Sequence, residues 1–300
     1  WYLISADGAT AGRLTMTQTA DGPVGFANCM KLDCTTADAS IAAGEYTLIV
    51  QKFEGQDLQS IGKGVTGAKE ITVSFYVKAN AAFTFGVELE DADNARQITK
   101  LFDTTTGWVR HEFTFAADVD DGSSPFDDDN AHSFSLNFWI HGGATYTGGT
   151  LNTASFANTT QANRAAGIDS FFSSTDNNFF ITGVQMEVGS VATNFEHRSV
   201  GEELALCKRY YNSTGAFSQY LLGRAANTGL PLQTYFFEIE MRAAPTITDN
   251  GNWTTGGGYQ DDVTYSTITN KGFLFIGTEN IGVGTIEWVN GGIVFMDSEL

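Results

Sequence analysis

The stretch Ile181–Tyr211, ITGVQMEVGSVATNFEHRSVGEELALCKRYY, carries the signals of three kinds of structure in one run. Residues Phe179–Val188 are apolar and rich in β-forming side chains, and Gly189 with Ser190 ends them, which predicts a strand. The segment Val191–His197 is too short and too mixed for a helix, so we expect it to be extended. The chain therefore passes here from a buried strand to a connection that must lead into the next element.

The last part of this stretch has the signals of a short helix. Ser199 followed by Glu202 is a capping box, in which the hydroxyl accepts from a free amide and the carboxylate reaches back to the cap. Leu204, Cys207 and Tyr211 then recur on one helical face. We predict a helix from Ser199 to Tyr211 that docks through this apolar face, because so short a helix is marginal alone.

The same segments resemble a family of known proteins. The strand GVQMEVG (183–189), the extended ATNFE (192–196) and the helix ELALCKRYY (203–211) are similar to a run found in tail-fibre and related virion proteins of tailed bacteriophages. Asn194 stands where that family often has proline. The block Tyr46–Ala79 resembles part of the carbohydrate-binding-module-like jelly roll of the same family. The resemblance spans roughly residues 1 to 211 and implies a homotrimer in the virion that contacts other tail proteins and a cell-surface glycan.

Composition agrees with a turn-rich β protein. The 300 residues include 33 Gly and 23 Phe, and no long helical periodicity lies outside the segment described above. A chain of this length can bury about three quarters of its unfolded surface, enough for two modest cores. The formal net charge of -19 repels a phosphate backbone and an anionic bilayer, so we expect neither nucleic acid nor membrane as a partner. No apolar run is long enough for membrane insertion, and no signal peptide is visible. Because the chain opens at Trp1, we expect a fragment of a longer protein.

Strand-like alternation runs through the first two hundred residues. Each segment places apolar residues on one face and polar residues on the other. The segments are Ile71–Lys78, Phe83–Glu90 and Phe134–His141. These features predict an all-β fold: a jelly-roll β-sandwich over residues 1–198, a linker helix over 199–211 and a smaller β domain over 212–300. The polar segment 152–178 is expected to be a long surface loop.

The smaller domain is predicted from two features. Residues 235–241 alternate and predict a strand that Pro245 follows. Residues 285–289 and 293–296 flank Asn290-Gly291-Gly292, which predicts a hairpin because these residues tolerate positive φ.

Cysteine and histidine usage points away from a redox or metal enzyme. Cys29 and Cys34 lie five apart in a probable strand, so they face opposite sides, and together with Cys207 they are expected to be buried thiols. The four histidines are dispersed, and no catalytic motif is present. We expect a protein that is not an enzyme and has no cofactor, although paired carboxylates of a glycosidase converge in space and not in sequence.

An acidic loop is a candidate cation site. Its carboxylates are closely spaced and could hold calcium, although their spacing is not that of an EF-hand. The alternative is a solvated acidic loop on an acidic protein, which we prefer. The residues are Asp118, Asp120, Asp121, Asp127, Asp128 and Asp129.

Trp139 is the leading candidate for a glycan platform. Strand parity places it with Asn137 and His141 on the polar face, beside a Gly-Gly loop that leads to Tyr146. An aromatic plane with polar groups around it suits a sugar ring. The alternative is that a loop or a neighbouring subunit covers Trp139. Turns of the C-terminal domain add two further candidates at loop tips, Trp253 and Tyr259.

Other aromatic and apolar features have structural interpretations. Trp108 is expected to pack at a strand entry. Tyr76 and Lys78 lie on the polar face of a different predicted strand, in the same sheet as Trp139 or in the other one. The apolar face of the helix either plugs the base of the jelly roll or meets two further copies about a three-fold axis, and the family resemblance favours the second.

Two functions from different classes therefore remain. The first is a virion structural protein, a tail fibre or related appendage that binds a host glycan. The second is a polysaccharide depolymerase at the same location. A capsid decoration or tail-connector protein without receptor role differs from the first only in its place on the particle.

Overall fold

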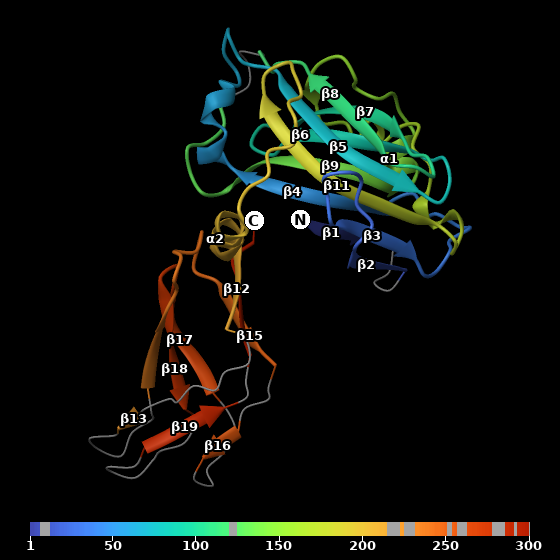
Figure 1. Cartoon of the computed structure of the whole chain (residues 1–300). Coiled ribbons are helices and arrows are strands. Elements are labelled where there is room, and N and C mark those ends of the chain that lie inside the picture. The colour runs from blue at the N-terminus through green and yellow to red at the C-terminus, as the bar shows by residue number, and fades with distance from the viewer. Residues whose placement is uncertain are drawn as a thin grey trace. The chain divides into compact units, whose positions relative to one another are not determined.

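The computed structural model describes residues 1–6, 13–119, 125–214, 223–224, 232–250, 254–256, 263–277, 286–290 and 293–299. The chain divides into two compact units, Trp1–Glu196 and His197–Leu300 (Figure 1). The capped helix belongs to the second of these units. None of the helices in the described part of the chain is long and apolar enough to cross a membrane.

The first unit contains two antiparallel sheets. The six-stranded sheet has the order β1-β4-β9-β6-β7-β10. Its strands are β1 (Tyr2–Ala6), β4 (Tyr46–Glu54), β6 (Thr84–Asp91), β7 (Arg96–Asp103), β9 (His132–Gly142) and β10 (Ala157–Asn158). The five-stranded sheet has the order β2-β3-β11-β5-β8. Its strands are β2 (Leu14–Thr19), β3 (Cys29–Cys34), β5 (Ile71–Ala79), β8 (Val109–Phe115) and β11 (Asn178–Val188). The predicted all-β jelly-roll sandwich is confirmed. Strands β5, β6 and β9 fall where alternation predicted them, and β11 falls where the apolar run predicted a strand.

The core of the first unit is formed by the facing sides of the two sheets. Phe85 and Phe138 from the six-stranded sheet pack in one cluster with Phe75 and Phe179 from the five-stranded sheet. The rings of Phe75 and Phe138 meet edge to face, with centroids 4.9 Å apart. Sheets that pack this way leave their outer faces to solvent or to covering loops.

The outer face of the six-stranded sheet is covered by a long connection between β9 and β11. This connection contains α1 (Ala144–Thr147), β10 and two single 3₁₀ turns, η3 (Gln161–Asn163) and η4 (Phe171–Ser173). Two further turns, η1 (Gly55–Asp57) and η2 (Gln59–Ile61), follow β4. The predicted surface loop over residues 152–178 thus has short elements within it.

Strand β11 leads into the segment that opened the sequence analysis. Residues 191–197 form neither a helix nor a strand, and α2 (Val200–Tyr210) begins after Ser199. The capping box is present, since the Ser199 hydroxyl accepts from the Glu202 amide and the Glu202 carboxylate accepts from the Ser199 amide. Tyr211 lies outside the helix and begins β12.

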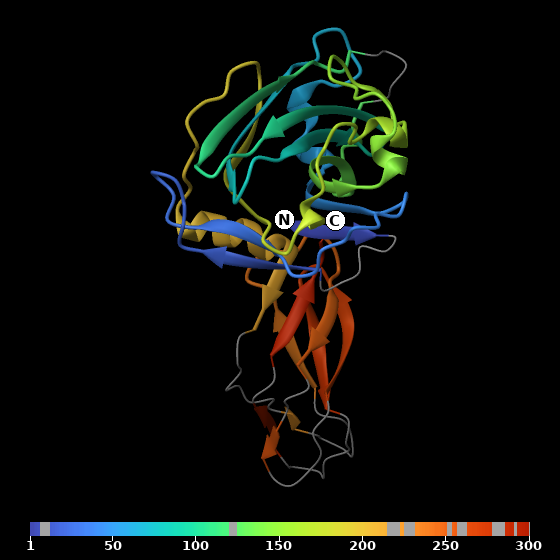
Figure 2. The ribbon, with the colours of Figure 1, turned by 90° about the vertical axis from the view of Figure 1, so that its right-hand side faces the viewer.

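The second unit is built of small sheets with three strands each (Figure 2). The first joins β12 (Tyr211–Ser213), β20 (Val294–Asp297) and β15 (Thr246–Asp249). The second joins β13 (Gly223–Arg224), β19 (Ile286–Asn290) and β16 (Thr254–Gly256). The third joins β14 (Leu232–Phe236), β18 (Gly272–Gly277) and β17 (Val263–Thr269). A core around Met241, Phe273 and Met296 includes residues of the first and third of these sheets.

Two expectations for this unit are wrong in detail. The strand predicted over residues 235–241 ends at Phe236, although burial continues to alternate as far as Met241. The strands that flank the predicted hairpin at Asn290 belong to different sheets, because β19 pairs with β13 and β16 whereas β20 pairs with β12 and β15. Gly291 and Gly292 lie outside the described residues.

The cysteines follow the prediction in part. Cys29 and Cys34 are buried free thiols. Burial raises the pKa of both, which keeps them protonated. Cys207 is exposed, so the expectation of a third buried thiol is wrong.

Candidate functional site

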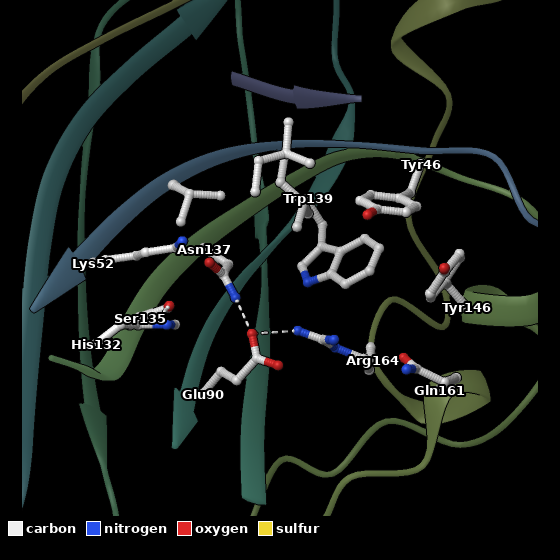
Figure 3. Close-up of a pocket in the computed structure, with 13 residues that line it drawn as sticks. Tyr46, Lys52, Glu90, His132, Ser135, Asn137, Trp139, Tyr146, Gln161 and Arg164 are labelled. Atoms are coloured by element: carbon white, nitrogen blue, oxygen red, sulfur yellow. Dashed lines mark hydrogen bonds and ion pairs between the residues drawn. The ribbon is translucent and has the colours of Figure 1, made fainter. Parts of the chain in front are cut away.

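The candidate site lies on the outer face of the six-stranded sheet, opposite the main core. A separate apolar cluster forms there around Trp139, with Leu48 and Val50 from β4 and Ala165 from the covering connection. A cavity of about 200 Å³ adjoins this cluster (Figure 3). Its lining residues are Ile4, Tyr46, Leu48, Val50, Lys52, Glu90, His132, Ser135, Asn137, Trp139, Tyr146, Gln161 and Arg164. The sheet supplies the floor, and the connection supplies Tyr146, Gln161 and Arg164.

Trp139 is packed, which corrects its prediction as an open platform. Strand parity is right, since Trp139 faces away from the core that contains Phe138. Its side chain is nevertheless only 1% exposed. Its Nε1 donates to Glu88 Oε2 at 2.9 Å, and the guanidinium carbon of Arg164 lies 5.1 Å from the ring centroid. The covering connection therefore occupies the aromatic face, as the alternative interpretation held.

Two tyrosines supply the accessible aromatic wall of the cavity. Tyr46 begins β4, and Tyr146 lies in α1 of the connection. Both are half-buried, and their rings meet edge to face with centroids 5.0 Å apart. The Tyr146 centroid lies 5.3 Å from that of Trp139. The wall therefore combines apolar ring surface with phenol groups, as a site for an amphipathic ligand requires.

The polar side of the cavity is an ionic network that fixes the connection to the sheet. Arg164 donates through Nε to Glu88 Oε1 at 2.8 Å and through Nη2 to Glu88 Oε2 at 2.7 Å. The same Nη2 lies 2.7 Å from Glu90 Oε2. Asn137 Nδ2 donates to one oxygen of each glutamate at 2.9 Å. Fork-shaped contacts of this kind hold a guanidinium in one orientation.

The charges of this network shift one another. Burial raises the pKa of Glu90, and the neighbouring Glu88 carboxylate raises it further, against the opposing effect of Arg164. Burial alone would lower the pKa of Arg164, but Glu88 and then Glu90 outweigh it and hold that pKa above its ordinary value. The guanidinium is therefore permanently charged, and Glu90 is the carboxyl that takes up a proton more readily than usual.

His132 and Ser135 complete the far end of the cavity. His132 Nε2 and Ser135 Oγ lie 2.7 Å apart. Burial lowers the pKa of His132 to about 4, and the charge of Lys52 acts in the same direction. His132 is therefore neutral at physiological pH and can serve the cavity as a hydrogen-bonding group without charge.

His141 does not lie on the same face as Asn137 and Trp139, so its predicted place in the glycan platform is wrong. A bulge shifts the pairing of β4 with β9, so that Thr47 pairs with His141 while Leu48 pairs with Trp139. Paired residues share a face, and Thr47 and Leu48 are neighbours on opposite faces, so His141 turns toward the core. There its ring packs against Phe172, with centroids 4.9 Å apart.

The described carboxylates of the acidic loop have separate surroundings. Asp118 is buried and forms a two-point ion pair with Arg96, at 2.7 and 2.8 Å. Asp127, Asp128 and Asp129 are exposed, and among the described residues no three acidic, histidine or cysteine side chains are grouped closely enough to hold a metal ion. Two further members, Asp120 and Asp121, lie outside the described residues.

The remaining predicted aromatic residues lie elsewhere. Tyr76 and Lys78 are on β5, in the five-stranded sheet, so they do not share a sheet with Trp139. Trp108 is half-buried next to Phe180, with ring centroids 6.3 Å apart, which agrees with its packing role. Two candidates at loop tips, Trp253 and Tyr259, lie outside the described residues.

Sequence reasoning missed most of the cavity. Tyr46 stands at the start of a recognised block, but nothing in the sequence shows that β4 is the neighbour of β9. Glu88 and Glu90 are visible as polar-face residues of β6. Arg164 lies in a polar segment without periodicity. A buried arginine that needs carboxylate partners is the signal that could have connected this segment to β6.

The comparisons with known proteins concern fold. No family model matches the sequence, and no curated protein matches it. Among solved structures, the chain is similar to the CBM22-1 xylan-binding domain of Paenibacillus barcinonensis Xyn10C, with 11% identity, 63% of this chain and 87% of that chain covered and a TM-score of 0.31.

Two further solved structures with similarity to this chain come from different kinds of protein. A family 11 carbohydrate-binding module from Clostridium thermocellum, in complex with a β-1,3-1,4-mixed-linked tetrasaccharide, has 14% identity, coverage of 64% of this chain and 91% of that chain, and a TM-score of 0.32. The enzymatically active domain of bacteriophage CBA120 tailspike protein 4 has 12% identity, coverage of 62% and 18%, and a TM-score of 0.32.

Proposed function

We propose that this chain is a structural protein of a bacteriophage tail fibre or related appendage and that it binds a cell-surface glycan in the cavity of its first unit. The single observation that carries the binding role is the cavity itself. Tyr46 and Tyr146 offer ring surface, with the Gln161 amide on the same wall as Tyr146, and Glu90 and Asn137 offer polar groups from the sheet. A sugar has the same two characters, with apolar C–H faces and polar edges.

The ionic network holds the wall of the cavity in place, and this supports a role in ligand binding. Arg164 ties the connection to the floor through two carboxylates, so the wall that carries Tyr146 and Gln161 is held near the sheet. A site held in its binding geometry loses less conformational entropy when the ligand enters.

The place in a virion rests on the sequence resemblance over Ile181–Tyr211. Strand β11 and the capped helix α2 stand at the first and last parts of that stretch, which supports the proposal. A homotrimer that contacts other tail proteins and a host glycan follows from the same resemblance. Several weak sites on one appendage would then act together through avidity.

Binding to a panel of immobilised bacterial surface polysaccharides tests the proposal. We expect saturable binding of at least one polysaccharide by the wild-type chain and about tenfold weaker binding by Tyr46→Ala. Tyr76→Ala is the matched control, because Tyr76 is half-buried on the other sheet. Equal binding by wild type and Tyr46→Ala would show that the cavity is not the site.

The depolymerase alternative has one observation in its favour and one against it. Two glutamates, Glu88 and Glu90, stand two residues apart on β6, and Asn137 Nδ2 contacts both. Glu88, however, has 0% exposed surface, and a nucleophile must reach the anomeric carbon. Reducing ends that accumulate during incubation with the bound polysaccharide, and that Glu90→Gln abolishes, would establish the enzyme.

A further inference from the structure

The cavity offers hydrogen-bond acceptors that the protein does not use. Both contacts of the Glu90 carboxylate, to Asn137 and to Arg164, end on Oε2. Figure 3 shows its second oxygen turned away from Asn137. Asn137 Oδ1 is buried and has no hydrogen-bond partner among the described residues. Two acceptors at separate points of the floor call for a ligand rich in donors.

The cavity lining carries charges of both signs. Two carboxylates, Glu88 and Glu90, share the guanidinium of Arg164. Lys52, the other cation of the lining, places its Nζ 5.3 Å from the ring centroid of Tyr2 on β1. Burial first, and the neighbouring Glu88 carboxylate second, raise the pKa of Glu90.

We propose that the cavity selects a sugar that carries a protonated amino group, with the ammonium bound to Glu90 Oε1 and the ring beside Tyr46 and Tyr146. This inference rests on the proposed function and specifies its ligand. An ammonium supplies three donors for the unused acceptors, and a charge-assisted hydrogen bond to the Glu90 carboxylate is stronger than one from a neutral hydroxyl. A uronic acid would instead bring its carboxylate against Glu90.

Oligosaccharides matched in length and linkage provide the test. The whole chain is titrated by calorimetry at pH 7 and physiological salt with β-1,4-linked tetramers of glucosamine, N-acetylglucosamine and glucose, which differ only at C2. A tetramer of uronic acid is the fourth ligand. We expect the glucosamine tetramer to bind about tenfold more tightly than the glucose tetramer and the acidic tetramer to bind least.

A pair of charge-matched variants separates the cavity from the overall charge. The chain has a formal net charge of -19, so a cationic sugar is attracted everywhere on its surface. Glu90→Gln should reduce the preference for glucosamine over glucose to near unity. Glu112→Gln, an exposed carboxylate on β8 of the other sheet, changes the net charge equally and should leave that preference intact. Glu88 keeps Arg164 anchored in Glu90→Gln, and the unfolding temperature confirms folding.

Each outcome decides between the two claims. If all tetramers bind equally and Tyr46→Ala weakens them all, the glycan site stands and the selectivity for amino sugars is overturned. The selectivity is also overturned if Glu112→Gln lowers the preference as much as Glu90→Gln does. If no tetramer and no polysaccharide of the panel binds, the glycan-binding function fails together with this inference. If Glu90→Gln does not fold, the order in which the four tetramers bind to the wild-type chain still decides the selectivity.

Discussion

Trp139 on the floor of the cavity contacts residues of its wall, and its indole nitrogen takes part in the hydrogen-bond network between the two. Nε1 donates to Glu88, which also holds Arg164. Replacing Trp139 by Phe keeps most of the ring volume and removes the donor, so we expect a loss of about 1 to 3 kcal/mol in the free energy of unfolding. Urea unfolding measures it, with Trp1→Phe at a half-exposed site as the control. Equal stability of the two variants would mean that Glu88 does not need this donor.

Gly183 is required by the backbone of β11. It has φ of 59° within a bulge, where the pairing with β5 shifts between Thr182 and Gln185. A Cβ at this position would lie 2.6 Å from an atom of the Phe26 ring. Gly183→Ala should therefore destabilise the first unit by about 1 to 3 kcal/mol.

Thermal unfolding checks the Gly183 prediction against a second glycine. Gly201 lies in α2, and a Cβ there would meet nothing within 4 Å. Gly201→Ala should leave stability unchanged or raise it slightly, because alanine favours a helix over glycine. Equal effects of the two substitutions would contradict the account of the bulge.

His132 gives the first unit a defined pH dependence. Its pKa is about 4 in the folded chain and about 6.5 when unfolded, chiefly because it is buried. Between these values the unfolded chain binds the proton and the folded chain does not, so stability is lost as pH falls from 6.5 to 4. We expect His132 to contribute about 1 to 2 kcal/mol of this loss after solvent screening. The free energy of unfolding, measured by urea unfolding between pH 4 and pH 6.5, should depend less on pH in His132→Gln than in wild type. His197→Gln is the control. The same pH dependence in wild type and both variants would contradict the prediction.

At the scale of elements, α2 depends on its capping box. Ser199→Ala removes the acceptor for the Glu202 amide and should cost about 1 kcal/mol of helix stability. Glu202→Ala should remove part of the same stabilisation, because the two contacts are reciprocal. Hydrogen exchange of the first-turn amides measures the effect in the single and double variants. Strictly additive losses in the double variant would argue against a working capping box.

Elements with a strong period could be predicted from the sequence, and the cavity could not. Strand β9 and helix α2 follow from alternation and from a cap, which are local signals. The burial of Trp139 was not predictable, because it depends on Arg164, which reaches Glu88 from a segment without periodicity. His141 was misplaced because one extra residue in a bulge reverses parity and leaves no mark in the pattern. The strands flanking Asn290 failed as a hairpin because each found partners distant in sequence.

For the whole molecule, the exposed surface of α2 bears on assembly. None of its 11 residues is buried, and Val200, Leu204 and Leu206 are exposed apolar residues. Exposed apolar groups on a short helix favour association with further copies, and the family resemblance implies three. We expect the mass of a trimer in light scattering at micromolar concentration, and Leu204→Glu should shift it toward one subunit. The mass of one subunit for the wild-type chain would contradict the trimer.

The most direct test of the central claim is the location of the bound glycan on the whole chain. A polysaccharide fragment retained by the wild-type chain is added at saturating concentration, and amide hydrogen exchange is compared with and without it. We predict protection at Ser135–Trp139 of β9 and at Gln161–Arg164 of the covering connection, and its loss in Tyr46→Ala. Protection confined to residues 263–277 of the second unit, or to the outer face of the five-stranded sheet, would contradict a glycan site in this cavity.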